Sequence, residues 1–328
     1  MRRLVGTHLW LLIALVGLVL PASASAATIP FLPTGSMNTP RYSLFAAPLA
    51  DGRVLVGGGY NGSATVKTTE IFNPATGAFS PGPDLPVPLQ DSAAALLPDG
   101  RVLVAGGSVT ANAEVYNPST NAFTAVGAMT HQRDGAVAAT LPDGRVLVAG
   151  GSDLGGSLNS TDIFDPQSNS FSSGPNMLKK RSGAAAATLG DGRILVAGGY
   201  GTSAPEPTSE IFDPKTGPFS LVPGSFLPTR DEMAGASLPD GRAVVVGGEN
   251  PGGDLDSATI FDPVTNVFST SGLGTMPFTR KVLAAAPVLS TGQVLVVGGY
   301  TYPPGEPVKT ALLLGTSAGF TQKVKARS

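Results

Sequence analysis

A nine-residue stretch recurs along the chain and constrains the fold more than any other feature. The sequence Asp-Gly-Arg-Val-Leu-Val-Ala-Gly-Gly occupies residues 99–107. Full or looser copies stand at 51–59, 143–151, 191–199, 240–248 and 291–299. The copies start 44 to 51 residues apart, and such a period predicts a repeat architecture in which each unit is one supersecondary structure. Because the six units fill the chain from residue 27 to 328, we expect a single domain.

Each repeat predicts four short strands. The first is rich in small residues, as at 183–189, and ends at the Asp-Gly pair. Asp-Gly between two apolar runs predicts a tight hairpin with a type I′ turn, which needs positive φ at both residues. The following Val-Leu-Val run is apolar without alternation, which is typical of a strand buried on both faces. A third strand ends in an aromatic residue before Asn-Pro or Asp-Pro, and a fourth begins with another aromatic residue.

These features together resemble the kelch repeat family. The shared features are the Gly pair, two aromatic residues seven positions apart, and an Arg ten residues before the turn in five of the six repeats. Two departures are Leu89 at the Arg position of the second repeat and Leu313 at the first aromatic position of the sixth. The resemblance implies an all-β, six-bladed β-propeller built from four-stranded antiparallel blades.

The two ends of the chain predict how the ring closes. Residues 28–40 look like a fourth strand with its linker, and they precede the first strand of the first repeat. The sixth repeat reaches its third strand at 310–314 and is followed only by a short basic tail at 321–328. We therefore predict that the N-terminal segment supplies the outer strand of the sixth blade. The alternative is that the C-terminal tail does so.

Residues 1–26 have the pattern of an export signal. Arg2 and Arg3 precede an apolar run at 9–20, and Ala-Ser-Ala at 24–26 fits a cleavage site. The run is shorter than the roughly 20 residues that span a membrane, although a retained anchor is the alternative. The signal predicts a periplasmic or extracellular protein without stable membrane insertion. We also expect a monomer. The remaining chain has 19 basic and 23 acidic residues, a net charge of −4, which argues against binding to nucleic acid.

A binding site is expected where the sequence of the repeats varies. In antiparallel blades, the loops between second and third strands share one face with the linkers between repeats. We call this the loop face and the opposite end the turn face. Variable loops on a rigid scaffold favour binding, and the kelch resemblance implies that ligands bind there. The candidate residues are Arg41, Tyr60, Arg133, Arg181, Tyr200, Arg230, Glu249, Arg280 and Tyr300.

The candidate arginines have two interpretations. A partial ring of Arg on the loop face would attract carboxylates. Alternatively, each Arg pairs with an acidic residue of the third strand in its own blade, which would neutralise the charge. Such acidic residues recur at Glu70, Glu114, Asp162 and Glu210.

Several short patterns resemble catalytic or cofactor-binding motifs, but each lacks residues or structural context that the motif requires. Residues 315–319 match a nucleophile elbow, but they fall at a turn, and the chain beyond the signal has a single His, His131. The glycines at 57–62 match a dinucleotide fingerprint but precede no helix. Asp254 and Asp256 lack the rest of a calcium loop, and the chain has no Cys. We therefore expect no cofactor and no metal.

These observations leave three hypotheses about function. The first is an exported, non-catalytic propeller that binds a protein or glycan through the loop face. The second is a carbohydrate-active enzyme centred on Glu249 and Arg230, either a lyase or an enzyme similar to bacterial sialic acid epimerases and mutarotases. The third is a passive component of the cell envelope or matrix.

Overall fold

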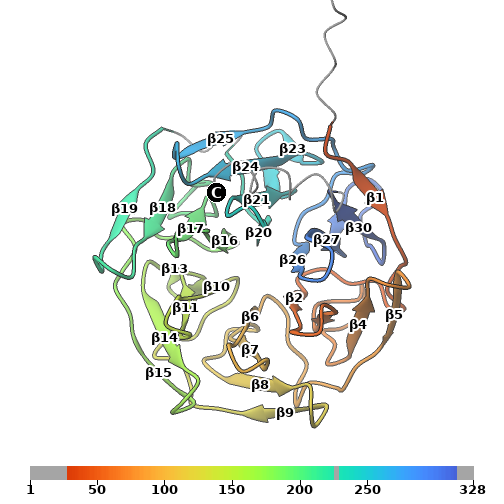
Figure 1. The fold of residues 1–328 in the computed structure, drawn as a ribbon, viewed down its shortest axis with the longest axis horizontal. Coiled ribbons are helices and arrows are strands. Elements are labelled where there is room, and N and C mark those ends of the chain that lie inside the picture. Colours follow the sequence, from red (N-terminus) through yellow and green to blue (C-terminus); the bar gives the residue numbers. More distant parts are fainter. Residues whose placement is uncertain (1–27, 225–228, 316–328) are drawn as a thin grey trace, which may run out of the picture.

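The computed structural model describes residues 28–224 and 229–315, which form six four-stranded antiparallel blades around a central axis (Figure 1). The predicted all-β, six-bladed architecture is therefore confirmed. None of the described segments is a helix of the length and apolar character needed to cross a membrane. The predicted signal at 1–26 lies outside the described residues, as does the elbow pattern beyond Gly315.

The strands of each blade follow the order predicted from the repeats, from the axis outward. Blade 1 contains β2 (Phe45–Pro48), β3 (Val54–Gly57), β4 (Thr69–Asn73) and β5 (Ala78–Pro81). Blade 2 contains β6 (Ala93–Leu96), β7 (Val102–Ala105), β8 (Ala113–Asn117) and β9 (Ala122–Ala125). Blade 3 contains β10 (Val137–Thr140), β11 (Val146–Ala149), β14 (Thr161–Asp165) and β15 (Ser170–Ser173). Blade 4 contains β16 (Ala185–Thr188), β17 (Ile194–Ala197), β18 (Ser209–Phe212) and β19 (Phe219–Leu221). Blade 5 contains β20 (Ala234–Ser237), β21 (Ala243–Val246), β24 (Ala258–Asp262) and β25 (Val267–Ser269).

The sixth blade joins the two ends of the chain. Its inner strands are β26 (Ala284–Val288), β27 (Gln293–Val297) and β30 (Ala311–Leu314), and its outer strand is β1 (Phe31–Pro33). β1 pairs antiparallel with β30, and the red β1 lies beside the blue β30 in Figure 1. The predicted closure by the N-terminal segment is therefore confirmed.

The Asp-Gly hairpins form as predicted, but the turn type is different. Gly52 has a φ of 87°, whereas Asp51 is not among the residues with positive φ. The amide of Gly52 donates to the carbonyl of Leu49 at 2.9 Å, and the amide of Leu49 donates to the carbonyl of Arg53 at 2.8 Å. This is a three-residue loop in which Gly alone takes the left-handed conformation, so the type I′ prediction is wrong. Asp51 instead accepts a hydrogen bond from the Arg53 amide at 3.0 Å, which stabilises the turn.

The hydrophobic core lies between blades. Every residue of β3, β7, β11, β17 and β21 is buried, as expected for the apolar second strand. Six clusters of buried side chains each join two neighbouring blades, as where Leu55 of β3 meets Val102 and Val104 of β7. Aromatic pairs support the outer strands, with the rings of Phe72 and Phe79 centred 5.0 Å apart. Each blade therefore packs its two faces against the neighbouring blades of the ring.

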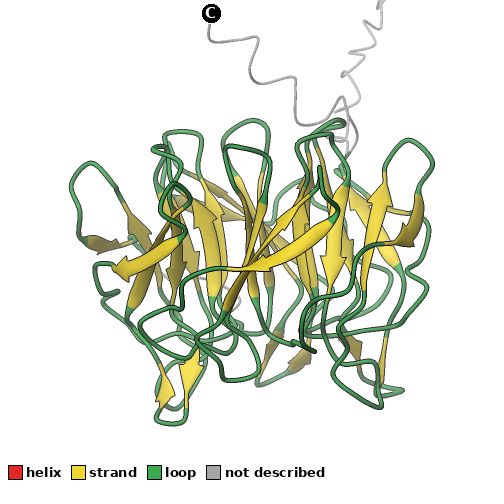
Figure 2. Ribbon diagram, turned by 90° about the horizontal axis from the view of Figure 1, so that it is seen from below, coloured by secondary structure: helices red, strands yellow, loops and turns green. Residues whose placement is uncertain are grey.

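The Gly pair allows neighbouring blades to approach closely. Gly59 has a φ of 88°, and its amide donates to the carbonyl of Leu89, which precedes blade 2, at 2.7 Å. A Cβ atom on Gly59 would lie 2.5 Å from the carbonyl oxygen of Tyr42, so no other residue fits without a shift. The chain then enters the loop face, where three loops form short hairpins that extend beyond the blades (Figure 2). They are β12 (Ser152–Asp153) with β13 (Gly156–Ser157), β22 (Glu249–Asn250) with β23 (Gly253–Asp254), and β28 (Tyr300–Thr301) with β29 (Glu306–Pro307).

Candidate functional site

The six segments that lead into the inner strands meet around the axis near the loop face. One residue of each segment has a positive φ, and these residues are Ser43, Asp91, Gly135, Gly183, Glu232 and Val282. Backbone hydrogen bonds link neighbouring members of this set from Glu232, through Val282, to Gly183; for example, the amide of Asp91 donates to the carbonyl of Ser43 at 2.8 Å. Left-handed backbone is costly for Val282 in particular, because its side chain is β-branched. This ring therefore holds the surrounding side chains in fixed positions.

A cavity of about 880 Å³ opens at this point of the loop face. Ligand sites in proteins commonly have volumes of about 300–1,000 Å³. Its lining includes five acidic side chains, which are Asp91, Asp134, Asp231, Glu232 and Glu249. Lys281 is the single basic side chain among the described residues that line it. The cavity is therefore acidic, which disagrees with the interpretation in which a partial ring of Arg makes the loop face basic.

Burial and mutual repulsion act on these carboxyl groups. Burial, followed by the repulsion of Glu249, raises the pKa of Asp231 to about 6 and that of Glu232 to about 7. Burial raises the pKa of Asp91 to about 6, and the nearby Asp134 adds to the effect. Three acidic side chains around one cavity thus change charge near neutral pH.

Lys281 neutralises one side of the cavity. Its Nζ donates to Oε2 of Glu249 at 2.6 Å and lies 3.7 Å from Oδ1 of Asp254 and 3.9 Å from Oε2 of Glu232. Burial disfavours the ammonium, but the Glu249 hydrogen bond and the surrounding carboxylates raise the Lys281 pKa overall. Lys281 therefore stays charged at neutral pH and engages Glu249 directly.

Tyrosines form the adjacent wall. The ring centre of Tyr42 lies 5.5 Å from that of Tyr60 and 5.5 Å from that of Tyr300, the latter in an edge-to-face arrangement. Tyr42, Tyr200 and Tyr300 line the cavity, and Tyr60 supports Tyr42. Aromatic and acidic side chains thus face the same space.

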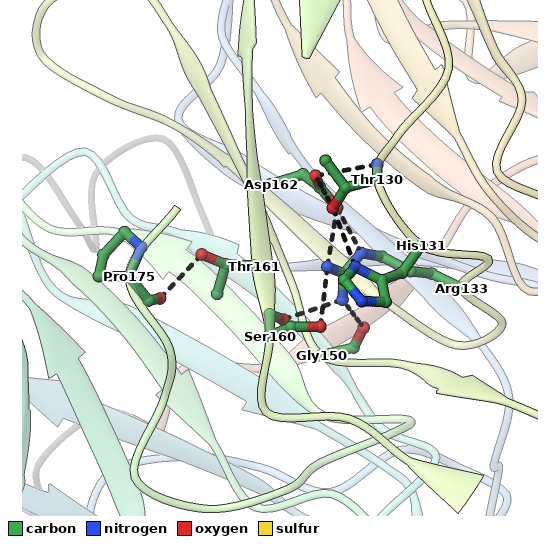
Figure 3. Close-up of polar contacts among 8 residues, drawn as sticks. All are labelled: Thr130, His131, Arg133, Gly150, Ser160, Thr161, Asp162 and Pro175. Atoms are coloured by element: carbon green, nitrogen blue, oxygen red, sulfur yellow. Dashed lines mark hydrogen bonds and ion pairs between the residues drawn. The ribbon is translucent and has the colours of Figure 1, made fainter. Parts of the chain in front are cut away.

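The candidate arginines lie elsewhere. Figure 3 shows that Arg133 reaches two carbonyls and one carboxylate inside its own blade. Nη1 donates to the carbonyls of Gly150 and Ser160 at 2.7 and 2.8 Å, and Nε and Nη2 donate to Oδ2 of Asp162 at 2.9 and 2.7 Å. The two carbonyls stand at the start and the end of one loop of the loop face. Arg133 therefore clamps that loop to its blade.

The same arrangement recurs wherever the repeat has an Arg at this position. The five arginines at this position have no exposed surface; they are Arg41, Arg133, Arg181, Arg230 and Arg280. Each donates to two backbone carbonyls at the ends of its loop. Burial lowers the pKa of Arg280 to about 10, which leaves it charged at neutral pH. None of the five lines the cavity, so the structure supports the internal role and not an electropositive loop face.

Three of these arginines pair with the predicted acidic residues. Arg41 lies 3.2 Å from Glu70, Arg133 lies 2.7 Å from Asp162, and Arg181 lies 3.0 Å from Glu210. In blades 5 and 6 the equivalent strand positions, opposite Val245 and Val296, are Thr259 and Leu312. The third strands of these two blades therefore have no acidic residue at that position.

Blade 2 shows the opposite mismatch. Leu89 replaces the Arg and packs in the core between blades 1 and 2. Glu114 remains at the acidic position and is 5% exposed, and its Oε2 has no hydrogen-bond partner among the described residues. Burial raises the Glu114 pKa. This blade therefore contains a buried carboxyl group without its arginine.

The sequence identified part of the cavity and missed the rest. Tyr200, Glu249 and Tyr300 line it, whereas Tyr42, Asp91, Asp134 and Lys281 were not among the candidates. The missed residues lie one or two positions after the Arg, or after Leu89 in blade 2. Glu249 and Arg230, the proposed catalytic pair, do not meet in the cavity because Arg230 is buried. Among residues 28–224 and 229–315, no three acidic, His or Cys side chains are placed to hold a metal ion.

Comparisons with known proteins agree with this architecture. The kelch motif matches residues 41–86 and 136–178. A solved structure of YjhT superimposes with a TM-score of 0.71 and 15% identity, covering 86% of this chain and 97% of that one. At this identity the likeness establishes the fold alone. No curated protein matches the sequence.

Proposed function

Because this chain is a β-propeller of the kelch repeat family, we propose that it is an exported, non-catalytic binding protein that holds a protein or glycan on its loop face. The cavity of about 880 Å³ at the axis carries this proposal. It is lined by polar and aromatic side chains from several blades, and buried arginines hold five of the six loops of the loop face to their blades. The pattern of residues 1–26 supports export.

A panel of ligands followed by hydrogen-exchange mapping tests the proposal. We expect a ligand selected from a peptide library or a glycan array to protect amides of the loop face, such as those at 60–68 and 249–257. The matched control region is the turn face, including 51–53 and 99–101, which should exchange at an unchanged rate. Protection confined to the turn face would refute the proposal.

A sugar-converting enzyme is the second candidate, and one observation favours it. Glu249, Asp231 and Glu232 share the cavity, and the pKa values of Asp231 and Glu232, about 6 and about 7, suit general acid–base catalysis. Exchange of sugar anomers can be followed by NMR for the wild type and for Glu249→Gln. Catalysed anomerisation that the substitution abolishes would overturn the non-catalytic proposal, whereas the background rate in both proteins supports it.

A further inference from the structure

We infer that the loop-face cavity binds an organic cation, the ammonium or guanidinium of a Lys or Arg side chain presented by a peptide segment of another protein. The inference rests on the proposed binding function and names the chemistry of its ligand. Acidic side chains, an unsatisfied buried oxygen, a tyrosine wall and an apolar rim each contribute to the argument.

The charge of the cavity favours a cation. Five carboxyl groups line it against the single ammonium of Lys281, which is already engaged by Glu249 at 2.6 Å. Asp91, Asp134 and Asp231 make no ion pair with Lys281 within 4 Å. A second cation would therefore find carboxylates that no basic side chain of the cavity satisfies.

Asp231 provides an independent indication of a ligand. Only 6% of this residue is exposed, it lines the cavity, and its Oδ1 has no hydrogen-bond partner among the described residues. Oδ1 of Asp134, in another blade, is also buried without a partner. Buried polar atoms are normally hydrogen-bonded, and exceptions commonly mark functional positions. The wall of the cavity therefore contains carboxyl groups whose hydrogen-bonding capacity the described residues leave partly unused.

The spacing of the acidic groups favours an organic cation over a metal ion. Within the described ranges, no three His, Cys, Asp or Glu side chains lie close enough together to share one ion. An ammonium or guanidinium on a flexible stem can reach carboxylates that are further apart. Tyr42 and Tyr300 line the same cavity, and the faces of aromatic rings attract such cations.

The rim of the loop face indicates a peptide as the source of the cation. Exposed apolar side chains stand on loop-face segments at Leu154, Leu178, Phe278 and Tyr302. Exposed apolar groups around a polar centre are typical of protein-binding surfaces. A peptide can place a Lys or Arg in the cavity and pack its neighbouring residues on this rim, whereas a free amino sugar would use only the cavity.

Blocked peptides of the form Gly-Gly-X-Gly-Gly test the inference by calorimetry. We expect X = Lys or Arg to bind, X = Nε-acetyl-lysine to bind at least tenfold more weakly, and X = Glu to show no binding. Equal binding of the lysine and acetyl-lysine peptides would overturn the inference. Binding of a glucosamine oligomer in preference to the Lys and Arg peptides would overturn the peptide source.

Two substitutions with opposite expected effects complete the test. Asp231→Asn should weaken binding of the lysine peptide at least tenfold, whereas Lys281→Met should strengthen it because Glu249 becomes available. Asp99→Asn, on the turn face, is the matched control and should change nothing. Unchanged affinity in both cavity variants would refute the inference.

The results also separate the two proposals. If an acidic or neutral ligand protects the loop face from hydrogen exchange, the cation inference fails while the binding function stands. If a ligand protects only the turn face, both fail.

Discussion

Replacing the isolated carboxyl group of blade 2 should stabilise the protein. Glu114 is buried without the arginine that its counterparts contact, because Leu89 occupies that position. A second partner is also missing. The amide of Asn38 donates to Glu70 at 2.7 Å in blade 1, whereas the equivalent position in blade 2 is Pro86, which has no N–H. Glu114→Gln keeps the shape of the side chain and removes its charge.

The expected gain is modest but measurable. An unsatisfied buried polar group costs about 1–3 kcal/mol, and a charged one costs more. Since Gln still leaves polar atoms to satisfy, we expect a net gain of about 1 kcal/mol in the free energy of unfolding at pH 8. That gain corresponds to a rise of about 2 °C in the melting temperature of a domain of this size.

The matched control is Glu210→Gln in blade 4. Glu210 lies 3.0 Å from Arg181 and accepts hydrogen bonds from the amides of Leu178 and Lys179 at 2.6 and 2.9 Å. Breaking a buried ion pair costs about 3–5 kcal/mol, so this variant should melt at least about 6 °C lower than the wild type. The same Glu-to-Gln substitution is therefore expected to raise the melting temperature in blade 2 and to lower it in blade 4.

The assay is thermal unfolding of both variants at pH 8, 6 and 4. Burial raises the pKa of Glu114 in the folded protein, so the wild type protonates this group as the pH falls, and the advantage of Glu114→Gln should disappear by pH 4. A loss of stability in Glu114→Gln at pH 8 would refute the reasoning, and so would a gain that persists at pH 4.

Three further predictions follow from the fold and the cavity. Deletion of residues 27–38 removes β1 and should lower the melting temperature by roughly 10 °C or more; an unchanged value would contradict the closure. Arg133→Lys cannot keep both the carbonyl and the carboxylate contacts, so urea unfolding should show a loss of about 3–5 kcal/mol, and full stability would contradict the clamp. The folded pKa values of Asp91 and Asp231, about 6, and of Glu232, about 7, are raised above their usual values, so the folded state binds more protons than the unfolded state in this range. Stability measured by urea unfolding should therefore rise as the pH falls from 8 towards 5, and a steady decline would contradict the assignment.

The scaffold could be predicted because it repeats. The period of the Gly pair, the apolar second strand and the N-terminal strand each describe local structure that every blade needs, and all three are confirmed. The turn type could not be predicted, because Asp-Gly suits both a two-residue and a three-residue loop. The pairing of Leu49 with Arg53 decides between them, and that register depends on the whole blade.

The candidate site was harder to predict because the position of a residue in the repeat does not show in which direction its side chain points. Arg41 and Tyr42 are neighbours, yet the first is fully buried in its blade and the second lines the cavity. The acidic residue in the same repeat, Glu70, was the signal for the internal role of Arg41. The signal for the cavity was the variation immediately after the Arg, as at Asp134 and Lys281.

Loop length explains why blade 2 can dispense with the arginine clamp. Its loop, residues 108–112, has five residues, whereas the corresponding loops of the other blades have nine or ten. The amide of Thr110 donates to the carbonyl of Gly107 at 3.1 Å, so this short loop closes on itself. A longer loop leaves carbonyls at its two ends that need a buried donor, and Arg supplies both hydrogen bonds. The shortest loop of the loop face is therefore that of blade 2, and it lies beside Asp91 and Asp134 of the cavity. When a peptide places its cationic side chain in the cavity, we expect the rest of its chain to run outward over blade 2.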